Sequence, residues 1–535
     1  MIRILRFFRK TELRLLSVFI VLHVLISLIY IHYQDPTIDE LPYYGYTVRW
    51  AHGAMDRVYE WDDSKTPATF PAIIPRAIYQ VFHPGYVTKD DGLYDLMMGR
   101  YLMCFYTIIT SIYLFVWCRK LFGKKGWILP VLFFLFSPLT LGYSMLVLSD
   151  MATGACMIAT FYHAWTFYNT RLQKQFILFS LWMGVSIVVK ASFVFIIPCL
   201  CTLLLILMVA GHLAFNIKKL AFYSLLATLL IVFVLNLSYF GIDTFRPLAI
   251  FKFRSQQFQL LAEKLSFLKG WYVPVPRAII EGWDLLQFHK ELGPGKVGST
   301  YGGVYVLGET YPQGAVWFYY MVVVAIKFPI AILLLFLAAL TSGIIYFNPK
   351  QFFTSHIFYV FPMVFFLVVL SCFNTFQSGV RHLLLIYPLI FMAIGALICY
   401  WQKKWQKTNL VVFILFASMI ASQLYYFPNL IPYTNEFLID KKDAFRITID
   451  SNLDYGHYSR YANTFIKEHP EYKKAPLSPQ TGKFILAIHD VFELRPADTK
   501  AYEWLFKLEP KAHYKFCYLL FEVTDKDLSK LSLAR

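Results

Sequence analysis

The run LRLLSVFIVLHVLISLIYI fills residues 13–31, and the polar segment HYQDPTIDE follows it at residues 32–40. About 17 to 25 mostly apolar residues let a helix cross ~30 Å of hydrocarbon, so the run predicts a transmembrane helix. A strand of a membrane barrel would alternate over about 10 residues, and this run does not alternate. No small-residue cleavage site follows it, so we expect a retained helix and not a removed signal peptide.

The rest of the chain repeats this pattern. Its 535 residues are 58% hydrophobic and 16% charged, with a mean hydropathy of +0.52, which is typical of an integral membrane protein. We predict eleven spans, at residues 13–31, 101–118, 126–148, 151–169, 174–190, 191–210, 219–240, 318–346, 355–373, 382–400 and 409–428. The connections on one side are all short, whereas the segments on the other side include three long ones.

Basic residues gather in the short connections. If the N-terminus is cytoplasmic, the inside segments hold 17 basic residues and one acid, Glu12. The basic residues are Arg3, Arg6, Arg9, Lys10, Arg14, Arg119, Lys120, Lys124, Lys125, Arg171, Lys174, Lys218, Lys219, Lys350, Lys403, Lys404 and Lys407. Positive charge marks cytoplasmic loops, so we predict an N-terminus inside and, after an odd number of spans, a C-terminus outside. The net charge of +17 therefore reflects orientation in a membrane and does not indicate nucleic-acid binding.

Chemistry is expected on the outer side of the membrane. No inside loop is large enough for a nucleotide-binding domain, which argues against an ATP-driven or nucleotide-sugar mechanism. We predict a membrane module at residues 1–428, with outer loops at 32–100 and 241–317, and an extracytoplasmic domain at 429–535.

The tail has the pattern of a small α/β domain. Alternation in residues 483–493 and 514–523 predicts strands, and residues 502–508 predict a helix. Of the eight cysteines, only Cys517 lies in an outer soluble segment, so we expect no disulfide within the domain. The predicted fold class is an α-helical membrane protein of about 11 spans with this α/β domain at its end.

The paired carboxylates Asp39 and Glu40 are the sharpest local feature. They lie just past the first span, where crowded acids are costly but suit the binding of a proton or a cation; the alternative is a solvated loop start. Further polar residues stand at the outer ends of spans, and one stands inside a span: Asp150, Lys190, Arg381 and His382 at the ends, and Lys327 inside. Charges in or at the bilayer usually line a site, although a terminal Lys or Arg can instead reach out to the headgroups. No His/Cys cluster has zinc spacing.

The order of the short motifs resembles a known family. The motifs are Asp39-Glu40, Gly99-Arg100-Tyr101, Leu121-Phe122-Gly123, Ser137-Pro138, Asp150, Leu307-Gly308-Glu309, Lys327-Phe328-Pro329, Gly379-Val380-Arg381-His382, Tyr433-Thr434-Asn435-Glu436 and Asp450–Gly456. Together they resemble bacterial family-39-type glycosyltransferases of the GT-C fold, related to protein O-mannosyltransferases and lipid A aminoarabinose transferases. The chain departs from the commoner pattern at Tyr455-Gly456-His457 and at His382, and Lys65 is only a loose counterpart of a lysine motif of the aminoarabinose branch.

The resemblance implies an inverting transfer of a sugar from a polyprenyl phosphate donor to a hydroxyl on a protein, a lipid or a glycan, at the outer face of the bacterial cytoplasmic membrane. Asp39 would be the general base, and Glu40 an acceptor-positioning or supporting carboxylate. The donor phosphate would meet Arg381, His382, Lys190 and Lys327, with Asp150 behind them. The motif at residues 450–456 would dock the tail or contact the substrate. No metal ligand is assigned; a divalent cation is a possible cofactor, since some GT-C enzymes use one, but the resemblance does not force it.

Two rival classes have charged residues among many helices as well. A lipid-linked sugar flippase or transporter would show helices broken by Gly or Pro at corresponding positions of two halves, and the sequence has no such symmetry. A non-catalytic scaffold would have no use for the Asp39-Glu40 pair.

Overall fold

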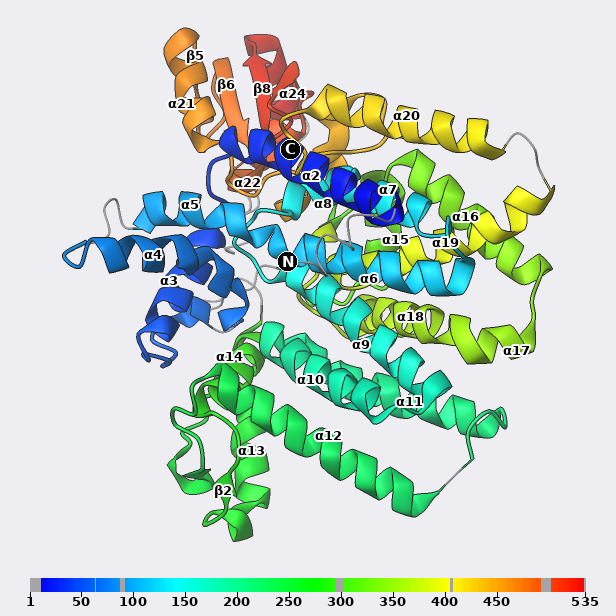
Figure 1. Cartoon of the computed structure of the whole chain (residues 1–535). Helices are drawn as coiled ribbons and strands as arrows, with labels where there is room; N and C mark the ends of the chain where they lie inside the picture. Colours follow the sequence, from blue (N-terminus) through cyan, green and yellow to red (C-terminus); the bar gives the residue numbers. More distant parts are fainter. Residues whose placement is uncertain are drawn as a thin grey trace.

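The computed structural model describes residues 11–62, 64–86, 92–214, 216–293, 303–404, 408–491 and 502–533. Of the basic residues counted above, Arg3, Arg6, Arg9, Lys10 and Lys407 lie outside the described residues. Long helices lie side by side in one body, and strands β5, β6 and β8 gather at one end of it (Figure 1). The longer helices are α2 (Thr11–His32), α6 (Phe105–Phe122), α9 (Asp150–Thr170), α10 (Gln173–Val189), α11 (Ile196–Val209), α12 (Ile217–Ser238), α16 (Ile330–Ile345), α18 (Ile357–Cys372), α19 (Tyr387–Lys404) and α20 (Thr408–Tyr426).

The chain is a multi-pass membrane protein by the length and hydropathy of its helices. Within the described ranges, six helical segments are long and apolar enough to cross a bilayer: Thr11–His32, Leu93–Phe122, Ala191–Val209, Ile217–Ser238, Pro349–Cys372 and Asn409–Tyr426. The pair α15 (Tyr319–Lys327) and α16 makes a seventh if the two count as one span, and it bends by 119°. The predicted count of eleven is therefore not confirmed.

Proline breaks and short helices account for much of the difference between the eleven predicted spans and the helical segments that are long enough to cross a bilayer. The predicted span 126–148 is divided into α7 (Ile128–Leu135) and α8 (Pro138–Tyr143), because Ser137 caps a new helix whose first residue is a proline. Likewise Pro329 stands between α15 and α16, where it cannot donate a backbone hydrogen bond. Helix α10 has only 17 residues.

The three long segments share one end of the helices (Figure 1). The first contains α3 (Glu40–Ala51), α4 (Ile74–Phe82) and α5 (Leu93–Met103), and the second contains α13 (Gln256–Lys264), α14 (Arg277–Leu292) and the short pairs β1 (Arg246–Pro247) with β2 (Tyr272–Val273) and β3 (Val304–Val306) with β4 (Glu309–Tyr311). The tail contacts both: the backbone N–H of Leu307 donates to Ile447 O at 2.8 Å, and that of Ile38 donates to Tyr455 O at 3.1 Å.

The tail carries a four-stranded sheet in the order β5-β6-β8-β7. Its strands are β5 (Tyr472–Lys474), β6 (Gly482–Ala487), β7 (Ala512–Tyr514) and β8 (Tyr518–Val523), and its helices are α21 (Ser459–Glu468), α22 (Ile488–Val491), α23 (Glu503–Phe506) and α24 (Asp525–Leu533). Strand β6 pairs antiparallel with β8, and β5 lies parallel to β6. The strand predicted over 483–493 was too long, because the chain turns into α22 at Ile488.

Close packing brings the helix ends together where the polar residues gather. A Cβ on Gly154 of α9 would lie 2.7 Å from the carbonyl oxygen of Leu384, so only glycine lets the short helix η8 (Val380–Leu385) approach α9 this closely. Helix η8 carries Arg381, and α9 begins at Asp150. Both residues are thereby held at the same end of the bundle.

We expect the three long segments to share one side of the membrane. Cysteines introduced at the exposed positions Asp56, in the first segment, and Lys526, in the tail, should react with an impermeant thiol reagent from the same side, and a cysteine at Lys124 from the other. Labelling of the Asp56 and Lys526 positions from opposite sides would contradict this topology. The variants need a background without the exposed Cys201 and Cys372.

Candidate active site

Asp39 lies where the first outer segment turns into α3. It stands directly before Glu40, the first residue of that helix, and its side chain is 30% exposed. The Arg381 guanidinium donates from Nη1 to Asp39 Oδ2 at 2.8 Å. The Tyr455 hydroxyl donates to the same oxygen at 2.6 Å, and it also contacts Arg381 Nη1. One carboxylate oxygen is thus held by two donors from distant parts of the chain.

Arg381 is fixed by its own turn. Its Nε donates to Ser378 O at 3.2 Å, and the neighbouring Val380 N–H donates to Asn452 Oδ1 at 2.8 Å. The guanidinium carbon lies 4.7 Å from the centre of the Tyr455 ring, in a cation–π arrangement. The side chain keeps 13% of its surface exposed. Arg381 is therefore ordered and still open to a ligand.

Asp150 and Lys190 continue the line of alternating charges. Lys190 Nζ lies 2.9 Å from Asp150 Oδ1, and Asp150 Oδ2 lies 3.9 Å from Arg381 Nη1. Asp150 opens α9 and Lys190 follows the last residue of α10, so two helix ends supply this pair. Asp39, Arg381, Asp150 and Lys190 form one cluster, which we call the charge cluster.

Lys65 adds a second cation near Asp39. Its charge lowers the pKa of the Asp39 carboxyl. Its Nζ lies 4.3 Å from the centre of the Tyr43 ring, and the residue is buried. In the sequence this lysine had only a loose match to a motif, because nothing local shows that its loop folds back onto Asp39.

The pKa of Asp39 is set by opposing effects. Burial raises it, whereas the charges of Arg381 and Lys65 and the hydrogen bonds from Tyr455 and Arg381 lower it. The lowering effects win, and the pKa lies well below its usual range. Asp39 is therefore ionised at physiological pH, as a proton acceptor must be, but it is a weak base while Arg381 remains paired with it.

Glu40 does not face the opening beside Asp39. Its carboxylate and the Arg100 guanidinium form an ion pair in which both side chains have no exposed surface. Arg100 Nε donates to Glu40 Oε1 at 2.8 Å, and the backbone N–H groups of Val147 and Thr37 donate to Oε1 and Oε2 at 2.9 and 2.8 Å. An acceptor molecule cannot reach this carboxylate. Of the two roles left open for Glu40, the geometry excludes direct acceptor positioning and favours support of the loop.

Lys327 also lies apart from the charge cluster. It ends α15, it is buried, and its Nζ donates to the carbonyl oxygens of Ile431 and Asn452 at 2.7 and 2.5 Å. The expected contact with a donor phosphate is wrong for this geometry, because backbone oxygens of the tail already hold the ammonium group. Lys327 ties α15 to the tail.

His382 lies beside the charge cluster. It follows Arg381 on η8 and is partly exposed, and its Nδ1 lies 3.3 Å from the Tyr320 hydroxyl. The charges of Lys190, Arg381 and Asp39 all act on its ring. The expected contact of His382 with a donor phosphate stays a prediction.

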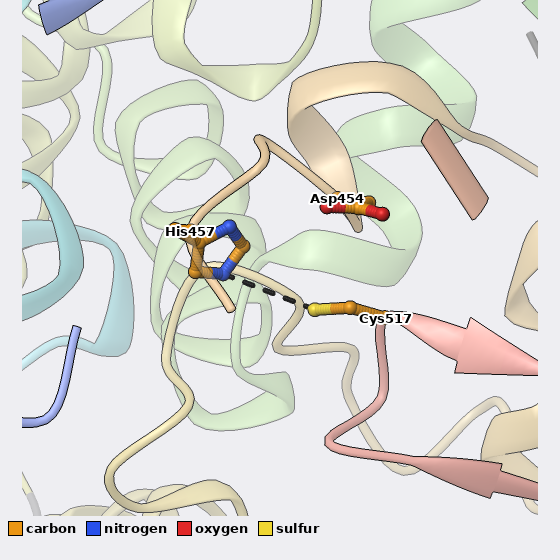
Figure 2. Close-up of side chains that lie close together, drawn as sticks. All are labelled: Asp454, His457 and Cys517. Atoms are coloured by element: carbon orange, nitrogen blue, oxygen red, sulfur yellow. Dashed lines mark hydrogen bonds between the residues drawn. The ribbon is translucent and has the colours of Figure 1, made fainter. Parts of the chain in front are cut away.

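Asp454, His457 and Cys517 are the one group of His, Cys, Asp or Glu side chains among the described residues that has metal-like spacing (Figure 2). Their ligand atoms lie within 4.8 Å of one another, and all three residues are buried. The proton positions, however, do not suit a metal. The Tyr455 N–H donates to His457 Nδ1 at 3.1 Å, so a neutral ring carries its proton on Nε2, which lies 3.9 Å from Cys517 Sγ.

Burial also keeps both groups neutral. It raises the pKa of the Cys517 thiol well above its ordinary value and lowers the pKa of His457 to about 3. The thiol donates to Leu453 O at 3.1 Å. A metal would need a thiolate and a free Nε2 lone pair, so Cys517 and His457 fit a neutral hydrogen-bonded pair better than two ligands of a cation.

No family model and no curated protein matches the sequence. Solved structures do match. The apo oligosaccharyltransferase of Archaeoglobus fulgidus covers 80% of this chain at 13% identity and a TM-score of 0.47. ArnT from Cupriavidus metallidurans bound to undecaprenyl phosphate covers 94% of this chain, which in turn covers 97% of ArnT, at 12% identity and a TM-score of 0.31.

These neighbours are GT-C glycosyltransferases. This chain spans 57% of the length of the archaeal enzyme. Because both TM-scores lie below 0.5, neither likeness supports a conclusion about this chain.

Proposed function

We propose that the chain is an inverting glycosyltransferase that moves a sugar from a polyprenyl phosphate donor to an acceptor hydroxyl on a protein, a lipid or a glycan. The observation that carries the proposal is the partly exposed Asp39 carboxylate bound to Arg381, with Lys190 and Asp150 beside them. A proton acceptor and phosphate-binding cations thereby stand next to each other at the ends of apolar helices, where a lipid-linked phosphate would arrive.

The residues suit a single displacement. Asp39 accepts the proton of the acceptor hydroxyl as its oxygen forms a bond to the anomeric carbon, and the bond from that carbon to the phosphate oxygen breaks. The leaving polyprenyl phosphate needs positive charge and no proton, which Arg381 and Lys190 supply, with Lys65 and His382 close by. One displacement inverts the anomeric centre.

Donor binding would also activate the base. Arg381 is paired with Asp39 in the molecule described here. A phosphate that takes over part of this guanidinium weakens the pairing, and the pKa of Asp39 then rises towards its ordinary value. The carboxylate becomes a stronger base only when a donor is present, which limits wasted reaction with water.

The site would face the outer side of the bacterial cytoplasmic membrane. The inside-positive charge pattern supports an N-terminus in the cytoplasm and the tail outside. In this arrangement residues 1–428 hold the lipid donor. Residues 429–535 form an outer domain that packs against the outer loops.

A transporter with two related halves is less well supported. Such a protein needs broken helices at corresponding positions in both halves. In the part of the chain that the structure describes, helices break at Pro138 and at Pro329, but only the pair at the second break, α15 with α16, is a bent span long and apolar enough to cross a bilayer. Sugar transfer from a synthetic polyprenyl phosphate donor by purified protein tests the proposal directly, since movement of the intact lipid without a new glycosidic bond would favour transport.

We expect Arg381→Ala to weaken binding of a polyprenyl phosphate by about ten- to a hundredfold, because a charge-assisted contact to phosphate contributes roughly 1.5 to 3 kcal/mol. Arg446→Ala is the matched control: this arginine is in the tail, is 44% exposed and pairs with Asp443. Its affinity should stay within about twofold. Fluorescence titration of the purified variants measures both, and equal affinities would remove Arg381 from the donor site.

A further inference from the structure

The segment Asp450–His457 of the tail contacts both the turn that carries Arg381 and the loop that carries Asp39. Towards Arg381, Ser451 Oγ donates to Ser378 O at 3.0 Å, and Asn452 Oδ1 accepts from Val380 N. Towards Asp39, the backbone N–H groups of Asp35 and Ile38 donate to the carbonyl oxygens of His457 and Tyr455 at 3.0 and 3.1 Å. The same eight residues therefore hold the Arg381 turn and the Asp39 loop.

Gly456 makes the contact with the Asp39 loop possible. Its φ is +72°, and a Cβ there would lie 2.7 Å from Ile38 Cγ1. A larger residue would be strained in this backbone conformation and would push the loop away. The glycine thus lets Tyr455 reach Asp39.

The buried cluster of Asp454, His457 and Cys517 anchors the segment to the sheet (Figure 2). Asp454 and His457 flank Tyr455 in the chain, and Cys517 stands in the turn between β7 and β8. The Cys517 thiol donates to Leu453 O, and the ring of His457 accepts the Tyr455 N–H. These bonds fix the backbone on both sides of Tyr455, so the position of its hydroxyl is set by the tail.

We propose that Tyr455 is a positioning residue of the transferase, through which the tail orients the Asp39 carboxylate; this inference rests on the proposed function. The Tyr455 hydroxyl donates to Asp39 Oδ2 at 2.6 Å, the same oxygen that accepts from Arg381 at 2.8 Å. These two donors fix the orientation of the carboxylate. In the proposed reaction the other oxygen takes the proton of the acceptor hydroxyl.

The hydroxyl also contributes to the acid limit of activity, beside the charges of Arg381 and Lys65. Its hydrogen bond favours the ionised carboxylate, so it lowers the pKa of Asp39. Transfer needs that ionised form and is lost as the pH falls through this pKa. Without the hydroxyl the pKa rises, and the loss therefore begins at a higher pH.

Tyr455→Phe is the test. It removes the hydroxyl and keeps the ring under Arg381, so donor KM should stay within about twofold while kcat falls by roughly ten- to a hundredfold. The acid limb of the pH–rate profile should move up by about one unit. The unmutated enzyme, the variant and Tyr458→Phe are compared in the same transfer assay from about pH 3 to about pH 8, an interval that includes the ordinary carboxyl pKa of about 4, towards which the pKa of Asp39 rises when a donor is bound.

Tyr458→Phe is the matched control. Tyr458 is also buried and lies three residues further on, but its hydroxyl donates to Pro428 O, away from Asp39. An effect on folding alone would move both variants alike and leave the acid limb in place. If Tyr455→Phe keeps the rate and the pH profile of the unmutated enzyme, the inference is wrong and the transferase proposal stands; if the unmutated protein transfers no sugar, the proposed function itself fails.

Discussion

Replacing Asp39 with asparagine is expected to lower the rate of sugar transfer by about 10² to 10⁴, because removal of a positioned general base typically costs this much. The amide keeps the size of the side chain and can still accept from Tyr455 and Arg381. The yield of folded protein should therefore stay nearly unchanged, and donor affinity should be kept or rise, because the phosphate no longer competes with a charged Asp39 for Arg381. Transfer from a synthetic polyprenyl phosphate donor, followed in single-turnover and steady-state experiments, separates the chemical step from binding.

Asp35→Asn is the matched control for this variant. Asp35 lies in the same loop, four residues earlier, and its carboxylate pairs with Arg460 at 2.8 Å, outside the charge cluster. Its loss should change the rate by less than about threefold. If the Asp39→Asn enzyme works at the unmutated rate, Asp39 is not the general base, and the proposed catalytic role of this loop is wrong.

There is a physical reason why the sequence could predict that the residues of the charge cluster lie close together. Asp39, Asp150, Lys190 and Arg381 each stand at the end of an apolar run, and a bilayer aligns such ends at one depth. Successive ends of the spans lie on alternate sides of the membrane, and the charge pattern of the loops assigns these four ends to the outer side. The positions of these residues at span ends, together with the family resemblance, led us to propose one site for all four, although they are spread over more than half of the chain.

The sequence does not show which distant segments provide partners for a buried charge. Glu40 and Lys327 looked like open charges, but Arg100 holds the first, and the carbonyl oxygens of Ile431 and Asn452 hold the second. A sequence shows that a charge is present in an apolar region, not whether another segment neutralises it. Tyr455 was included only within the tail motif, since its contact with Asp39 depends on how the tail folds back.

The helices of the described residues do not confirm the predicted count of eleven spans, for a related reason. A hydropathy window averages over a proline, whereas a helix cannot continue its hydrogen bonds through one. Ser137-Pro138 and Phe328-Pro329 were both noted as motifs, and both mark breaks in the helices. In this chain the breaks place Tyr143 of α8 and Lys327 of α15 against the tail, where they bond to the carbonyl oxygens of Ser451 and Asn452.

Arg100→Ala is expected to destabilise the protein by about 3 to 5 kcal/mol, because it leaves the buried Glu40 carboxylate without its cation. The variant also loses the bonds from Arg100 to the carbonyl oxygens of Gln34 and Asp35, at 2.8 and 2.9 Å, which hold the loop before Asp39. A large fall in the thermal midpoint and in folded yield, measured in detergent, would follow. Arg119→Ala is the control, since the partly exposed pair of Arg119 with Glu12 should contribute less than about 1 kcal/mol.

The double variant Arg100→Met with Glu40→Leu tests whether this ion pair only stabilises the structure or takes part in the reaction. Removing both charges takes away the cost of an unpaired buried ion, so the double variant should regain much of the stability that Arg100→Ala loses. If Glu40 supports the loop and does not react, the folded double variant should also transfer sugar at a measurable rate, lowered only as far as the Asp39 loop has shifted. A double variant that is fully folded, binds the donor normally and transfers no sugar would instead show that Glu40 takes part in the reaction, and the assignment of Asp39 as the only carboxylate in contact with the acceptor would be wrong.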